Sequence, residues 1–169
     1  MKIDQQVLHA HRAELAYLLN HYLTEHLVRV SRAFGGDLTA AVVLGTIAHH
    51  NLRRFHDEVV TKSAESMHDL VQRGAHREYL RPCNAMSVAS ATGVPRETVR
   101  RKIAWLVARG WVRRVGRDQL YIDEKVGADF AQFSLGTIEL LSGMLAQFGA
   151  AVARRAHAGD GRRRVAASD

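Results

Sequence analysis

The sequence predicts a mainly α-helical chain that carries one small β-hairpin. Only two prolines occur among 169 residues, which leaves little of the turn chemistry that a strand-rich fold needs. Apolar residues recur at helical spacing over several long stretches. Two short β-like runs, WVRRV at 111–115 and QLYI at 119–122, are separated by the turn residues 116–118, a spacing typical of a hairpin.

The N-terminal part predicts two long helices. Residues 5–34 form the first, and its apolar residues are Leu8, Leu15, Leu19, Tyr22, Leu27 and Val30. Gly35 and Gly36 can end it, and Asp37 is a good N-cap for a second helix over about 38–55. That second helix is apolar nearly all round through Ile47, as expected of a helix covered by its neighbours.

The middle of the chain changes character at about residue 84. Residues 56–81 are mixed and weakly periodic, with a short helix expected near 63–73. Asn84 can cap a helix over 85–92 that Gly93 ends. Pro95, which lacks an amide hydrogen, suits the start of another helix that runs to about Arg109 and stops at Gly110.

A last long helix is predicted over 129–155. Its apolar residues follow 3-4-3-4 spacing, typical of a helix that packs lengthwise on another: Ile138, Leu141, Leu145, Phe148 and Val152. Residues 130–153 carry one charge, Glu139, over a length that could span a bilayer, but polar residues and glycines interrupt the run. We therefore expect a buried packing helix.

These elements predict four parts of the chain. Residues 1–81 are expected to form N-terminal core and dimerisation helices, 82–124 a binding region, 125–156 a C-terminal packing helix, and 157–169 a disordered basic tail. The single cysteine, Cys83, excludes a disulfide framework. The N-terminus has no basic start followed by an apolar stretch, so no signal peptide is expected. A cytoplasmic protein fits both features.

The excess positive charge of the chain lies in one segment. The formal net charge is +7, and residues 94–117 alone hold eight basic groups against one acid, so the rest is balanced. The basic groups are Arg96, Arg100, Arg101, Lys102, Arg109, Arg113, Arg114 and Arg117. A concentrated positive field favours a polyanion, because each neutralised phosphate releases condensed counterions. A solvated helix face is the alternative reading of such a run.

The segment NAMSVASATGVPRETVRRKIAWLVARGWVRRVGRDQLYI (84–122) resembles the winged helix-turn-helix of bacterial regulators such as the MarR and GntR families. The matching features are the Val88-Ala89 pair, the turn at 92–94, the Thr98-Val99 opening of the second helix, and the run after Leu106 through 109–112. The resemblance covers about a quarter of the chain. It implies that the second helix enters the major groove of DNA, that the hairpin touches the backbone or minor groove, and that the flanking long helices form a dimer interface.

The residues of the second helix support this interpretation without the family. Val99, Ile103 and Leu106 share one face and should pack inward. The opposite face presents Glu97, Arg101, Ala104 and Ala108, with Arg100 at its edge. Small alanines beside arginines let a helix approach DNA closely.

Specific roles follow from side-chain chemistry. Arg100 and Arg101 are candidates for reading guanine, whose O6 and N7 a guanidinium matches bidentately. Glu97 either accepts from cytosine or pairs with Arg101, and we favour the pairing. The predicted phosphate contacts are Arg96, Thr98 and Lys102 on the helix and Arg114 and Arg117 on the hairpin. Trp105 and Trp111 are expected to be structural; stacking on single-stranded bases is the minor reading.

Other chemistry has weaker support. Histidines are numerous in the N-terminal half, at His21, His26, His49, His50, His56, His68 and His76, but none lies in a dense ligand motif. His49 and His50 point about 100° apart on a helix, which makes them poor joint ligands. Cys83 is expected to be a packing residue, although nearby Arg81 and a helix start would favour a thiolate. We expect no metal, no cofactor and no enzymatic activity, since no nucleophile or phosphate-loop motif is present.

The sequence thus predicts a DNA-binding transcriptional regulator that forms a homodimer through 5–34 and 129–155 and binds an inverted-repeat site in double-stranded DNA. Control by an unidentified small-molecule effector bound between the helices stays open. The alternatives are a winged-helix protein-interaction module that does not bind DNA, an RNA-binding protein using the same surface, and a metal- or redox-responsive regulator.

Overall fold

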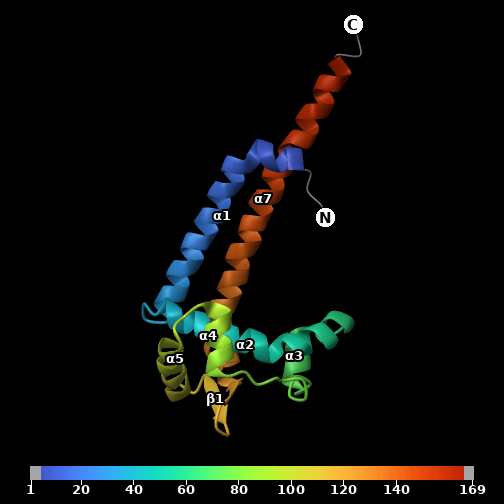
Figure 1. Ribbon diagram of the computed structural model, residues 1–169. Helices are drawn as coiled ribbons and strands as arrows, with labels where there is room; N and C mark the ends of the chain where they lie inside the picture. The colour runs from blue at the N-terminus through green and yellow to red at the C-terminus, as the bar shows by residue number, and fades with distance from the viewer. Residues whose placement is uncertain (1–4, 166–169) are drawn as a thin grey trace. The chain divides into compact units, whose positions relative to one another are not determined.

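The structure is a computed structural model that describes the backbone of residues 5–165 and their side chains except those of Val7 and 154–165. Its elements, in chain order, are α1 (Gln5–Ala33), α2 (Leu38–Glu58), the 3-10 turn η1 (Val60–Lys62), α3 (Met67–Gln72), α4 (Ala85–Thr92), α5 (Arg96–Ala108), β1 (Val112–Val115), β2 (Gln119–Ile122), α6 (Lys125–Asp129) and α7 (Ala131–Val165). The strands form one antiparallel hairpin (Figure 1). A mainly α-helical chain with one small hairpin is confirmed.

Element bounds agree closely in 84–122 and less well outside it. The helix predicted over 63–73 is divided between η1 and the six-residue α3. The last helix begins with the short α6 and then continues as α7 to Val165, beyond the predicted end at 155. Residues 157–165 of the tail, for which disorder was expected, are therefore helical. No proline in 131–165 interrupts the helix. Residues 166–169 lie outside the described part of the chain.

The chain divides into two compact units, one made of α1 and α7 and the other of Phe34–Phe130. This grouping differs from the predicted division at 81. Helix α2 was expected to belong with the N-terminal helices, but it packs on α4, α5 and β2. Likewise α6 belongs to the second unit, whereas 125–156 was predicted as one packing helix.

In the first unit, α1 and α7 lie side by side and run in opposite directions (Figure 1). Leu15, Leu18 and Ala151 are buried in this unit. Arg29 Nη2 donates to the backbone oxygen of Phe133 at 3.1 Å. Gly136 makes room for that guanidinium, since a Cβ there would lie 2.5 Å from Arg29 Nη2.

Much of the apolar surface of this helix pair is exposed. Ile138 and Leu145, from the predicted packing seam, are 59% and 55% exposed. Only 6% of the apolar 18-residue window within Ala131–Ala153 is buried, and by length and composition alone this stretch could cross a membrane. The predicted lengthwise packing is confirmed, because α7 packs along α1. The expected burial is wrong for the single chain, because α7 buries one narrow face and leaves a second apolar face exposed.

The core of the second unit is built around α2. One stripe of this helix is buried and consists of Ala40, Val43, Leu44, Ile47, Asn51 and Phe55. The expected N-cap is confirmed, because the Asp37 side chain accepts from the backbone N–H of Ala40 at 2.9 Å. The stripe packs against α5 and β2, so α2 forms the base on which the basic segment rests.

Helix α4 and the turn to α5 follow the predicted chemistry. Asn84 and Ser87 form a reciprocal capping box at the start of α4. Gly93 ends the helix with φ +70°, a left-handed conformation that disfavours residues with a Cβ. Val88 of α4 is buried, as are the α5 residues on the predicted inner face. The turn between the two helices is therefore fixed by local sequence.

The hairpin is attached to the unit by backbone and side-chain bonds. Arg114 pairs with Leu120 in the β1–β2 register, and Leu120 also forms an isolated antiparallel bridge with Cys83. The Cys83 N–H donates to Leu120 O at 3.3 Å, and the Leu120 N–H donates to Cys83 O at 2.9 Å. The segment just before α4 thus extends the small sheet and holds the hairpin beside α4 and α5.

Candidate nucleic-acid interface

Helix α5 presents a basic outer face over an apolar inner one. Val99, Ile103 and Leu106 are at most 1% exposed, which confirms the predicted inner face. Arg96, Glu97, Arg100, Arg101, Ala104 and Ala108 are exposed. The inner face fixes the rotation of the helix, and this rotation directs the arginines of its first two turns outward.

The hairpin contributes two further arginines. Side chains alternate between the faces of a strand, so Arg114 lies on the opposite face of β1 from Arg113. Arg117 lies in the turn between β1 and β2, directly after Gly116, whose φ is +60°. Both arginines are exposed, and both line a hollow between the hairpin and α5.

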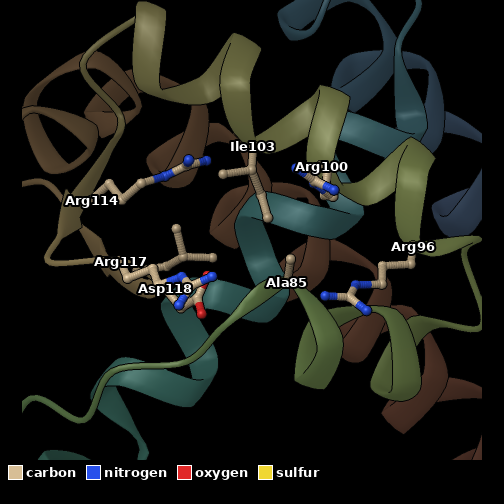
Figure 2. Close-up of a pocket in the computed structure, with 8 residues that line it drawn as sticks. Ala85, Arg96, Arg100, Ile103, Arg114, Arg117 and Asp118 are labelled. Atoms are coloured by element: carbon tan, nitrogen blue, oxygen red, sulfur yellow. The ribbon is translucent and has the colours of Figure 1, made fainter.

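This hollow brings four of the predicted site residues together. It is lined by Ala85, Arg96, Arg100, Ile103, Arg114, Arg117, Asp118 and Leu120. Figure 2 shows the guanidinium groups of Arg96 and Arg114 extending toward each other from opposite sides. Ile103 and Leu120 are nearly fully buried and provide an apolar floor. The arginines of α5 and the hairpin therefore form one contiguous cationic surface.

Most of these arginines are available to an external anion. Within the described residues, no ion pair involves Arg96, Arg114 or Arg117. Arg100 lies 3.8 Å from Glu97, and both side chains are largely exposed. An exposed pair at that distance contributes little and is easily exchanged for a phosphate.

The pairing predicted between Glu97 and Arg101 is wrong. Glu97 lies beside Arg100, three residues on, and Arg101 Nη2 instead donates to Thr98 Oγ1 at 3.4 Å. Thr98 is half-buried, and Arg101 is exposed outside the hollow. The i,i+3 neighbour is as close as the i,i+4 one on a helix, so sequence spacing could not distinguish them.

Lys102 has a structural partner where a phosphate contact was predicted. Its Nζ donates to Asp37 Oδ2 at 2.6 Å, and each side chain is only 27% exposed. Burial raises the pKa of the Asp37 carboxyl, but hydrogen bonds from Lys102 and from the backbone of Ala40 and Thr39 outweigh it and leave the pKa below its usual value. Lys102 thus connects α5 to the start of α2, and we remove it from the candidate interface.

Arg109 and Arg113 also have internal roles. The Arg109 guanidinium lies 4.0 Å from the centre of the Trp105 ring. Arg113 Nε lies 3.2 Å from Asp123 Oδ2. The charge that the sequence concentrates in 94–117 is therefore divided. Lys102, Arg109 and Arg113 have partners within the unit, whereas the side chains of Arg96, Arg100, Arg101, Arg114 and Arg117 are exposed and have, among the described residues, at most a weak partner on the same helix.

The two tryptophans are structural, as predicted. Trp111 is 7% exposed, and its Nε1 donates to Asp129 Oδ2 at 2.7 Å. This bond from Trp111 lowers the pKa of the Asp129 carboxyl. Trp105, Trp111, Phe34 and Phe130 form one aromatic cluster with ring centres between 4.9 and 6.5 Å apart. Trp111 buried in such a cluster is not free to stack on nucleic-acid bases.

Asn51 is an important residue that the sequence interpretation missed. Its side chain is fully buried in α2, and Nδ2 donates to Arg81 O at 2.6 Å and to Leu120 O at 3.2 Å. Its Oδ1 accepts from the Ile122 N–H at 2.6 Å. One side chain thereby connects α2 to β2 and to the segment before α4. The sequence did contain a signal of this role, because Asn51 is a polar residue on the apolar stripe of α2, between Ile47 and Phe55.

The residues considered for redox or metal chemistry are mostly packed or scattered. Cys83 is buried, and burial raises the pKa of its thiol to about 11, which suppresses the thiolate. In the described residues no group of three or more His, Cys, Asp or Glu could hold a metal ion. His49 and His50 both line a shallow groove beside Ala91, and they belong to no such group. His76 is buried against the Phe55 ring.

Comparison of the chain with protein-family models, curated proteins and solved structures finds no match. The resemblance to the MarR and GntR families therefore stays a prediction from the sequence. The geometry of α4, α5 and the hairpin is then the basis for inferring a function.

Proposed function

We propose that this chain is a sequence-specific DNA-binding transcriptional regulator of the cytoplasm and that 84–122 acts as its winged helix-turn-helix. Two helices joined by a tight glycine turn and followed by a hairpin occur in the required order. In this proposal α5 enters the major groove and the hairpin contacts the backbone. Helix α2 supports these two helices from behind the proposed DNA-binding surface, since it packs against both α4 and α5.

The observation that carries the proposal is the shared cationic surface of α5 and the hairpin. Arg96, Arg100, Arg114 and Arg117 come from two elements, yet they line one hollow. This convergence places positive charge where the phosphate backbone of a duplex would pass. A helix face that is merely solvated would not require arginines from a second element beside it. Arg101, exposed on α5 outside the hollow, is the candidate for reading base edges.

The proposed assembly is a homodimer formed through the helix pair. Leu135, Ile138 and Leu145 of α7 form one exposed apolar face, and α1 exposes Leu19, Leu23 and Leu27. Contiguous apolar surface on a soluble protein marks an interaction site. A two-fold dimer would carry two recognition helices to successive major grooves about 34 Å apart, which predicts an inverted-repeat site. This helix pair is also where we expect any small-molecule effector to act.

The direct test is selection of bound fragments from random double-stranded DNA by the full chain. Recovery of an inverted repeat would support both specific binding and the dimer. Arg101→Ala should relax the recovered sequence preference, and Arg117→Ala should weaken binding to all sequences evenly. Recovery of no enriched sequence, with no measurable affinity for duplex, would overturn the proposal.

The rival classes predict different ionic-strength behaviour. A winged-helix protein-interaction module should bind its partner with weak salt dependence, whereas DNA affinity should fall steeply as salt rises. An RNA-binding protein would prefer an RNA duplex in competition. The buried Cys83, with its raised thiol pKa, weighs against a redox-responsive regulator.

A further inference from the structure

The hollow between α5 and the hairpin is large enough for more than one phosphate of a DNA backbone. Its volume is about 430 Å³, which lies within the range of roughly 300–1,000 Å³ typical of small-molecule sites. Arg96 and Arg114 reach inward from opposite sides, and Arg100 lies between them (Figure 2). A small anion held inside would therefore contact several guanidinium groups at once.

The lining selects for a particular ligand chemistry. Four arginines face a single acid, Asp118, which leaves an excess of three positive charges. Planar guanidinium groups bind phosphate bidentately. The floor formed by Ile103 and Leu120 is apolar and buried, which strengthens charge interactions above it and suits a sugar or base. A compact anion with two or more linked phosphates fits this combination better than an isolated phosphate.

We propose that this hollow binds a free polyphosphate anion, of which pyrophosphate and nucleoside triphosphates are the simplest examples, and that the bound anion excludes DNA from the same arginines. The exclusion of DNA rests on the function proposed above, but the anion site itself does not. A duplex backbone and a free polyphosphate share the same recognition chemistry. Competition between them would make the occupancy of the hollow a means of regulating DNA binding.

Titration calorimetry of the full chain with pyrophosphate, and separately with ATP, tests the site. We expect saturable one-to-one binding that Arg96→Ala and Arg114→Ala each weaken by about tenfold or more, because each removes charged hydrogen bonds. Both side chains are exposed, so both variants should fold. The matched control is Arg73→Ala, which removes the same charge from an exposed position outside the hollow, where Arg73 pairs with Glu65.

Two results would overturn the anion site. One is equal weakening by all three variants, which would show attraction to net charge alone. The other is absence of binding, or affinity for pyrophosphate no greater than for orthophosphate or sulfate.

A parallel competition experiment separates this proposal from the function itself. Pyrophosphate should displace a labelled duplex from the wild-type chain at the concentrations at which it saturates the hollow. Duplex binding that pyrophosphate does not displace would refute the exclusion and leave the proposed function intact. Pyrophosphate binding in a chain with no affinity for duplex would refute the function and preserve the anion site.

Discussion

Replacing Asn51 with alanine tests how the basic hairpin is held in place. The variant removes three hydrogen bonds: from Nδ2 to Arg81 O, from Nδ2 to Leu120 O, and from the Ile122 N–H to Oδ1. Leu120 O keeps a second donor, the Cys83 N–H, at 3.3 Å. The Ile122 N–H and Arg81 O lose bonds that are partly buried, and the Asn51 side chain itself is fully buried, so the cost exceeds that of a solvent-exposed bond.

The magnitude follows from these three contacts. A net contribution of about 1 kcal/mol for each bond, with a further penalty for buried groups left without partners, gives about 3–4 kcal/mol. Such a loss is a large fraction of the stability of an ordinary domain, roughly 5–15 kcal/mol. The midpoint of thermal unfolding should fall by about 10 °C or more.

Urea unfolding followed by tryptophan fluorescence is the suitable assay. Both tryptophans, Trp105 and Trp111, lie in the aromatic cluster of the second unit, so the signal reports that unit alone. The matched control is Gln72→Ala, at an exposed position in α3 of the same unit, where the change should stay within about 0.5 kcal/mol. A loss of less than about 1 kcal/mol for Asn51→Ala would refute the reasoning.

Four further outcomes are expected. Asp37→Asn keeps an N-cap but breaks the ion pair with Lys102. The pKa of Asp37 is lower in the folded chain than in the unfolded chain. The pair therefore stabilises the wild type fully at pH values above the unfolded pKa of Asp37, and this stabilisation is lost as pH falls through the folded pKa. Acid titration of unfolding should therefore show a steeper decline in the wild type than in Asp37→Asn, and parallel curves would contradict this. Gly93→Ala, at φ +70°, should lower stability by about 1–2 kcal/mol in the same urea assay, and a neutral result would exclude the left-handed turn. Cys83, buried and with a thiol pKa of about 11, should react with a thiol reagent at pH 8 only after unfolding, and rapid labelling of the native chain would contradict its packing role. Leu145→Glu should convert a dimer to a monomer by light scattering, whereas Glu139→Gln should not, and a dimer that survives Leu145→Glu would place the interface elsewhere.

The sequence specified the central segment well because its signals are local. The cap at Asn84, the glycine turn at Gly93 and the strands on either side of Gly116 each depend on residues a few positions apart. Backbone preferences of glycine and asparagine act without help from the rest of the fold. The element bounds therefore agree to within one residue across 85–122.

Contacts between distant residues could not be predicted in this way. Whether α2 joins the basic segment or the N-terminal helix depends on packing between residues that are far apart in sequence. The pair formed by Lys102 and Asp37 joins residues 65 positions apart, so nothing near Lys102 marks it as occupied. The same holds for Arg113 and Asp123, which are brought together only by the hairpin register.

The candidate site illustrates both what local sequence signals predict and what they do not. Sequence reasoning found all four arginines of the hollow, because they lie on one helix face and at one hairpin. It did not find that they surround a hollow, which requires the distance between α5 and the hairpin. The hairpin is positioned in part by Asn51 and by the bridge at Cys83, both of which act through backbone atoms of β2.

The salt dependence of duplex binding tests the central claim most directly. The affinity of the full chain for a selected duplex should be measured across a range of salt concentrations, alongside a variant with Arg96, Arg100, Arg114 and Arg117 all replaced by alanine. Each lost phosphate contact should reduce the slope of log affinity against log salt by about 0.9, so the variant slope should be shallower by roughly 3–4. Equal slopes and equal affinities for the two proteins would contradict the assignment of this surface to DNA.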